Sequence, residues 1–191
     1  MDESIDCVML AAGVSSRMGK WKMTLPSKGS TIIECSVSNA LKVCSRVILV
    51  TGYRVKELEQ LFHDWEQVEL AYNAQYEKAM FSSVKLGVSL VRTKRFFLAL
   101  GDMPLVDQAV YEKLLNFPQA TAVIPKYRGK KGHPILLSWD VVKCIAELEE
   151  TRTLRDVLAR FPTLAVPVEN SHILNDIDKP KDYKNIIDTR L

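Results

Sequence analysis

Residues 5–20 read IDCVMLAAGVSSRMGK, and Lys22 lies just beyond this stretch. Residues 5–11 form a short apolar run that ends just before Gly13, a pattern that predicts a buried β-strand. The loop that follows matches neither the Walker sequence nor the dinucleotide-binding fingerprint. A buried strand that opens directly into such a loop favours an α/β fold with a ligand at the end of the strand.

The chemistry of this loop favours an anionic ligand. The small residues 11–13 let a backbone approach a ligand closely. Ser15 and Ser16 offer hydroxyl groups, and the backbone N–H groups after them can cradle an anion. Arg17 and Lys22 are cations suited to phosphate oxygens. The alternative is a glycine-containing surface loop that carries two solvated cations.

The rest of the chain alternates between strand and helix patterns. We expect strands at residues 46–51, 68–72, 95–100, 120–124, 134–137, 164–168 and 172–174. We expect helices at residues 31–44, 55–62, 82–91, 107–117, 138–148 and 153–161, and a last one opened by Pro180. Residues 134–137 follow the previous strand too closely for a crossover helix, so this strand is predicted to be antiparallel. The pattern predicts one Rossmann-like domain over residues 1–191, an α/β three-layer sandwich with a mostly parallel sheet.

Composition narrows the classes of partner. The chain has 191 residues, of which 47% are hydrophobic, and a formal net charge of +3, which is too small for a nucleic-acid binder. The sequence shows no apolar run long enough to span a bilayer and no basic signal region at its start. The four cysteines lack the spacing of a zinc site. We therefore expect no nucleic-acid or membrane partner, reduced thiols and a cytoplasmic location.

Carboxylates mark two later segments. Asp102 follows the strand at residues 95–100 and precedes an X-Pro turn, where it is either a ligand of Mg²⁺ or a turn cap. Asp176 and Asp178 are two residues apart, so in an extended segment they point the same way and can complete a metal site with Asp102. The alternative for Asp178 is that it caps the helix opened by Pro180.

Three other segments are weaker candidates. His133 lies between Gly132 and Pro134, after a basic loop, and is a substrate contact, a catalytic group or a structural histidine. Asn73 follows a strand and is a candidate to read a base edge. Ser82 and Ser83 open a predicted helix, whose N-terminus can hold an anion.

These segments together resemble the MobA-like nucleotidyltransferases of the molybdenum cofactor, within the wider glycosyltransferase-A-like group. The signatures, in the family's order, are LAAGVSSRMG…K (10–22), LVTGYR (49–54), SSVKLG (82–87), GDMP (101–104), GHPILL (132–137) and NDIDKPKDY (175–183). The Leu-Ala-Ala-Gly form resembles the cytidylyl branch, whereas guanylyl relatives more often have a second glycine that makes room for a purine. This sequence departs from the family at residues 79–83, where it has AMFSS in place of the common Gly-Met-Ser-Ser-Ser.

The resemblance implies the roles of the site residues. Arg17, Lys22 and Asp102 are expected to be catalytic, and Mg²⁺ is expected on Asp102 with Asp176 and Asp178. The expected nucleotide-binding residues are Leu10, Ala11, Ala12, Gly13, Ser15, Ser16, Arg17, Lys22, Gly52, Asn73, Ser82, Ser83, Gly101 and Asp102. The expected acceptor-binding residues are Met103, Pro104, Lys131, Gly132, His133 and Pro134.

The implied reaction transfers CMP from CTP to the terminal phosphate of molybdopterin. It gives molybdopterin cytosine dinucleotide and pyrophosphate, and a molybdenum hydroxylase is a candidate receiver of the product. Alternatives are the use of GTP, another phosphorylated acceptor such as a sugar phosphate, or a non-catalytic accessory protein that binds the cofactor.

Overall fold

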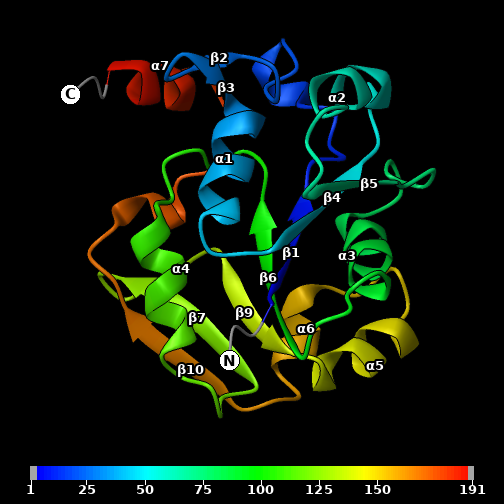
Figure 1. The fold of residues 1–191 in the computed structure, drawn as a ribbon, viewed down its shortest axis with the longest axis vertical. Helices are drawn as coiled ribbons and strands as arrows, with labels where there is room; N and C mark the ends of the chain where they lie inside the picture. The colour runs from blue at the N-terminus through cyan, green and yellow to red at the C-terminus, as the bar shows by residue number, and fades with distance from the viewer. Residues whose placement is uncertain (1–3, 189–191) are drawn as a thin grey trace.

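The structure is a computed structural model that describes residues 4–188, with side chains as far as residue 185. An eight-stranded sheet runs in the order β10-β7-β9-β6-β1-β4-β5, and β8 pairs with β7 (Figure 1). The strands are β1 (Asp6–Leu10), β4 (Arg46–Thr51), β5 (Val68–Tyr72), β6 (Arg95–Leu100), β7 (Ala122–Tyr127), β8 (Lys130–Lys131), β9 (Ile135–Ser138) and β10 (Thr163–Pro167). A separate hairpin joins β2 (Pro26–Ser27) to β3 (Ser30–Thr31).

Strand directions confirm a mostly parallel sheet. β1 pairs in parallel with both β4 and β6, β4 with β5, and β7 with β10. β9 runs antiparallel to its neighbours β6 and β7, as the short connection before it predicted. A strand reached without a crossover helix has to return in the opposite direction.

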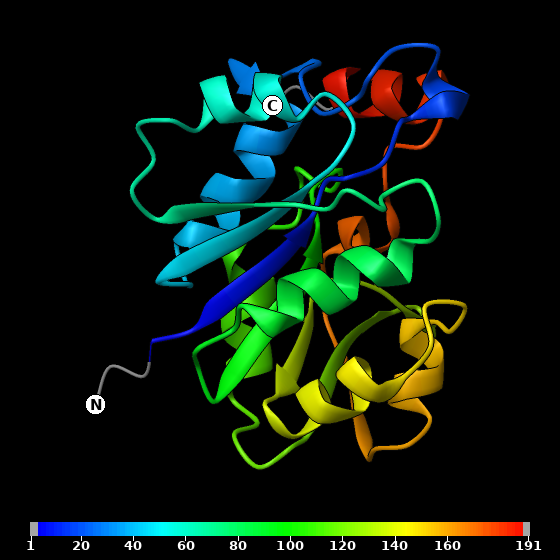
Figure 2. The ribbon, with the colours of Figure 1, turned by 90° about the vertical axis from the view of Figure 1, so that its right-hand side faces the viewer.

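Helices cover both faces of the sheet, which confirms the three-layer α/β class. Alternate residues of β1 face opposite sides, so Cys7 and Met9 join one core cluster while Val8 and Leu10 join the other. The first cluster packs under α1 (Ile32–Leu41), α2 (Val55–Leu61) and α4 (Gln108–Leu115). The second packs under α3 (Met80–Ser89), α5 (Asp140–Glu147) and α6 (Leu154–Leu158), and α3 and α5 lie side by side on this face (Figure 2).

Local sequence explains where several helices begin. Thr31 caps α1 through a capping box with Glu34, and Asp107 caps α4 by accepting a hydrogen bond from Val110 N. The last helix is α7 (Pro180–Asp188), and the hydroxyl group of Tyr183 donates to Pro26 O of the β2–β3 hairpin. No helix among residues 4–188 is both long and apolar enough to cross a bilayer.

Some predictions from the sequence are wrong in detail. The helix predicted at residues 82–91 begins at Met80, so Ser82 and Ser83 lie within its first turn and do not open it. Residues 172–174 are not a strand but part of a 3₁₀ helix, Ser171–Leu174, because the Asn170 side chain accepts from His172 N and turns the chain. The strand predicted at residues 120–124 is β7, which starts later and runs through Pro125. Proline lacks an N–H group but keeps its carbonyl oxygen, and Pro125 O accepts from Gly132 N at 2.9 Å.

The connections leave a crevice at the carboxyl ends of β1 and β6. From β1 the chain passes to β4 on one side, and from β5 it returns to β6 on the other side of β1. Open α/β sheets bind ligands at such a switch point. Leu10 and Leu100 are register partners here, and Gly101 N donates to Leu10 O at 2.9 Å. The loop after β1 and the segment at Asp102 are therefore direct neighbours.

Candidate active site

The loop after β1 is folded back on itself above the crevice. Ser15 adopts a left-handed conformation with φ 56°, and Ser16–Met18 form one 3₁₀ turn. Ser15 Oγ accepts from the backbone N of Lys22 at 3.3 Å, and the indole of Trp21 donates to Gly13 O at 3.3 Å. These bonds hold the far end of the loop against its start, so the Lys22 side chain points to the switch point.

Three carboxylates gather at the same place. Asp102, Asp176 and Asp178 each bring one oxygen within 4.8 Å of the others. Ile177 N donates to Asp102 O at 3.2 Å, which fixes the late segment beside the end of β6. Asp176 and Asp178 lie on either side of Ile177 and both reach this cluster, as their spacing predicted. Hard oxygen donors of this kind fit a divalent cation such as Mg²⁺ or Mn²⁺.

Two cations of the first loop face these carboxylates. Lys22 Nζ lies 2.5 Å from Asp102 Oδ2 and 3.2 Å from Asp178 Oδ1. A nitrogen of the Arg17 guanidinium lies 2.7 Å from Asp178 Oδ2. Lys22 and Asp102 are both buried, whereas the Arg17 side chain is 65% exposed. The Lys22–Asp102 pair is therefore the poorly solvated centre of the site.

The environment of Asp176 disfavours its charged form. Its pKa is raised, first by burial and then by the negative charges of Asp178 and Asp102, while Lys22 acts in the opposite direction. Carboxylates that crowd one another in this way gain from a shared cation. The raised pKa of Asp176 thus agrees with a cation-binding arrangement.

A cavity of about 330 Å³ is lined by both the loop and the carboxylates. Its wall includes Ala12, Arg17, Lys22 and Asp102. Further residues of the wall are Leu10, Gly13, Val14, Ser15, Ser16, Met23, Tyr76, Met80, Ser83, Leu100, Asp176 and Asp178. The structure thus brings most of the residues predicted for the nucleotide and the metal around one space.

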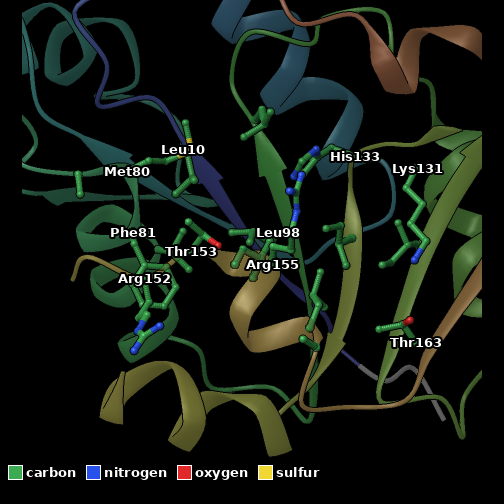
Figure 3. Close-up of a pocket in the computed structure, with 18 of the residues that line it drawn as sticks. Leu10, Met80, Phe81, Leu98, Lys131, His133, Arg152, Thr153, Arg155 and Thr163 are labelled. Carbon is green, nitrogen blue, oxygen red and sulfur yellow. The ribbon is translucent and has the colours of Figure 1, made fainter. Parts of the chain in front are cut away.

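A larger cavity of about 1070 Å³ adjoins the first one (Figure 3). Lys131, Gly132 and His133, which were predicted to contact an acceptor, lie on its wall. In Figure 3, Met80 and Leu10 lie on one side of this cavity and Lys131 and Thr163 on the other. Residues 150–155, which precede and open α6, also line it, and no sequence pattern singled them out. Leu10, Met80 and Leu100 line both cavities.

His133 is held as a neutral imidazole. Burial lowers its pKa to about 4. Its backbone N donates to Ile173 O at 3.0 Å, and the following bond to Pro134 is cis. A Cβ atom on Gly132 would lie 2.1 Å from Ile173 O, so only glycine fits there. The 3₁₀ helix Ser171–Leu174 thus fixes the place of His133 on the wall.

Several predicted contact residues lie away from both cavity walls. Asn73 is buried, and its amide donates to Ser82 Oγ and Ser83 Oγ, each at 2.9 Å. Ser83 lines the smaller cavity, so Asn73 does not line the wall itself but hydrogen-bonds to a residue that does. The other predicted residues that line neither wall are Ala11, Gly52, Ser82, Gly101, Met103, Pro104 and Pro134. Gly52 allows close packing, because a Cβ there would lie 2.8 Å from Ala12 O and 2.5 Å from Tyr76.

The wall also contains residues that sequence reasoning missed. Tyr76 and Met80 line the smaller cavity, and Met80 is 70% exposed at the start of α3. A large apolar side chain that begins a helix at the end of a sheet is the signal in the sequence that could have found Met80.

Comparison with known proteins agrees with this geometry. The MobA-like NTP transferase domain family matches residues 7–166. This chain belongs to that family. It is 38% identical over 180 residues to the molybdenum cofactor cytidylyltransferase of Escherichia coli (strain K12), with 94% of each chain covered. It is 27% identical over 156 residues to a probable molybdenum cofactor guanylyltransferase of Methanosarcina acetivorans, covering 78% of this chain and 69% of the relative.

Solved structures of similar fold support the architecture of this MobA-like NTP transferase. The crystal structure of Rv0371c from Mycobacterium tuberculosis H37Rv superposes with a TM-score of 0.85 and 23% identity, covering 98% of this chain and all of the other. A complex of Rv0371c with manganese has a TM-score of 0.82 at 21% identity, with the same coverage. At these identities the likeness concerns the fold.

Proposed function

We propose that this protein is a cytidylyltransferase that transfers CMP from CTP to the terminal phosphate of molybdopterin. The observation that carries the proposal is the smaller cavity, in which Arg17 and Lys22 face Asp102 and its two neighbouring carboxylates. The 38% identity to a cytidylyltransferase over nearly the whole chain supports CTP as the nucleotide. Ala12 on the cavity wall supports the same choice, because it occupies space that a second glycine would leave to a purine.

The triphosphate fits the side of the cavity formed by the first loop. Ser15, Ser16, Arg17 and Lys22 line it there, and the two cations would neutralise the charge that develops on the leaving pyrophosphate. Asp102, with Asp176 and Asp178, would hold a divalent metal, for which we propose Mg²⁺. When bound, this metal supplies Lewis-acid neutralisation of phosphate oxygens.

The larger cavity is the proposed acceptor site. An oxygen of the acceptor's terminal phosphate attacks the α-phosphorus of CTP, the bond from this phosphorus to the β-phosphate bridge breaks, and pyrophosphate leaves. The nucleophile is already anionic, so the reaction needs no strong base. The low pKa of His133 agrees, because a neutral imidazole on the wall can orient a substrate by hydrogen bonding. Lys131 and Arg155 supply positive charge to the same cavity.

Other parts of the proposal rest on the sequence. We propose that the chain acts as one domain, because strands from its beginning and its end lie in one sheet. A molybdenum hydroxylase as the receiver of the product and a cytoplasmic location are kept as proposals. The described cysteines are free thiols, with Cys7 and Cys44 buried, which is the state expected of a reducing compartment.

A pyrophosphate-release assay tests the proposal. The purified protein is given molybdenum-loaded molybdopterin and each of the four nucleoside triphosphates, with and without Mg²⁺. We expect release with CTP and Mg²⁺, and mass spectrometry should show molybdopterin cytosine dinucleotide. Release only with a sugar phosphate as acceptor would contradict the assigned substrate. Tight nucleotide binding with no release under any condition would instead favour an accessory protein.

A further inference from the structure

The ammonium group of Lys22 lies on the oxygens that the proposed metal would use. Its Nζ atom contacts Asp102 Oδ2 at 2.5 Å and Asp178 Oδ1 at 3.2 Å. Asp102 and Asp178 are two of the three carboxylates whose oxygens lie within 4.8 Å of one another. One side-chain cation of the protein thus bridges two of the three candidate metal ligands.

This contact is a buried one. Lys22 is 8% exposed and Asp102 is 9% exposed, so water screens their charges poorly. An ammonium group is a compact point charge with three donors, and it competes directly with a metal for carboxylate lone pairs. A divalent cation that approaches Asp102 would find the carboxylate lone pairs already occupied by the Lys22 ammonium group. It would also be repelled by the positive charge of that group. The ammonium group therefore has to leave before the metal can bind well.

The proposed triphosphate would offer Lys22 another set of partners. Its backbone N is tied to Ser15 Oγ, so the residue stays at the mouth of the first loop whatever its side chain does. Its side chain lines the same cavity as Ser16 and Arg17, where the triphosphate is proposed to lie. Phosphate oxygens there would accept the ammonium hydrogen bonds that the carboxylates give up.

We propose that Lys22 couples metal binding to nucleotide binding, by occupying the metal carboxylates until a triphosphate draws its ammonium group away. The inference rests on the proposed function, because it takes both the metal and the triphosphate from it. Coupling of this kind is reciprocal, so each ligand strengthens the binding of the other. It also predicts that removing Lys22 tightens the binding of a free metal ion, although Lys22 is part of the catalytic site.

The test measures Mn²⁺ binding to the nucleotide-free protein by electron paramagnetic resonance. The variants are Lys22→Met, which removes the ammonium group, and Lys20→Met as the matched control. Lys20 is exposed, and its replacement by Met removes an equal charge from the same loop. We expect Lys22→Met to bind Mn²⁺ about tenfold more tightly or better, within the usual range of coupling between sites. Lys20→Met should stay within about twofold of the wild type, as exposed charges are screened.

A double variant, Lys22→Met with Asp102→Asn, tests whether the ion binds at Asp102. It should lose the tighter Mn²⁺ binding that Lys22→Met alone is expected to show. If Lys22→Met folds poorly with Asp102 left unpaired, Lys22→Gln takes its place, and the rise in its melting temperature with Mn²⁺ should exceed that of the wild type. Equal or weaker Mn²⁺ binding by the Lys22 variants would overturn the coupling while leaving the metal site in place. An equal gain in Lys20→Met would also overturn it. No Mn²⁺ binding by any of the proteins would refute the metal site, and with it that part of the proposed function.

Discussion

Replacing Asp102 by Asn tests the charge at the centre of the site with little change of shape. The backbone of this segment is held by Gly101 N on Leu10 O and Ile177 N on Asp102 O, and neither bond uses the carboxylate. Lys22 keeps a second carboxylate, since Asp178 Oδ1 lies 3.2 Å from its Nζ. The free energy of unfolding should therefore fall by about 1–3 kcal/mol, which is the cost of one poorly hydrogen-bonded buried polar group. A buried charge left without any partner would cost more.

Turnover should fall much further than stability. Loss of one preorganised electrostatic group costs about 10²–10³ in kcat, or roughly 3–4 kcal/mol of transition-state stabilisation. We expect pyrophosphate release by Asp102→Asn to fall about a hundredfold or more at saturating CTP, molybdopterin and Mg²⁺. The control is Asp107→Asn, because Asp107 caps α4 and asparagine caps helices equally well.

The measurement is the rate of pyrophosphate release, paired with a thermal melt of each variant. Asp107→Asn should keep nearly all of its turnover. If folded Asp102→Asn works within about threefold of the wild type, the carboxylate at the end of β6 has no electrostatic role and the reasoning fails.

Three other predictions follow from the walls of the site. Gly132→Ala should lower the free energy of unfolding by about 1–3 kcal/mol, because its Cβ would press on Ile173 O; urea denaturation measures this, and an unchanged midpoint would contradict the close approach. Ala12→Gly should shift the ratio of kcat/KM for CTP and GTP toward GTP by about tenfold, the scale of one small group in a pocket, and an unchanged ratio would remove Ala12 from base selection. Because the pKa of His133 is lowered to about 4, the unfolded chain binds more protons than the folded one between pH 4 and 6.5, so stability should rise with pH there. His133→Asn should remove about 2 kcal/mol of the stability gained between pH 5 and pH 7, and an unchanged pH dependence would contradict the shift.

Much of the fold followed from local patterns. β4 and β5 have the bounds that their β-branched and apolar runs predicted, at residues 46–51 and 68–72. Caps were equally readable, since Thr31 and Asp107 begin helices through bonds to residues only three positions away. Short-range chemistry of this kind is fully contained in the sequence.

The errors arose where side-chain caps outside the expected elements, or distant segments, decide the conformation. The end of β7 depends on a bond from Gly132, and residues 172–174 turn because Asn170 caps them and because His133 binds Ile173 O. The carboxylate cluster was predicted from a spacing of two residues and a resemblance. The larger cavity was not, because residues 150–155 are distant in sequence from most of the other residues of its wall.

The boundary between the two cavities bears on how transfer is favoured over hydrolysis. Leu10, Met80 and Leu100 line both spaces, so the proposed triphosphate and acceptor would meet at an apolar wall. No hydroxyl, carboxylate or imidazole of these three residues can activate a water molecule there. The adjoining position 81 is Phe, where the run in the family that the sequence resembles has Ser, and Phe81 lines the larger cavity. The side chains of Leu10, Met80 and Leu100 offer water no strong hydrogen-bond partner, whereas the proposed acceptor phosphate would arrive already charged and would be held by the larger cavity. The apolar wall would thus select the nucleophile by excluding its commonest competitor.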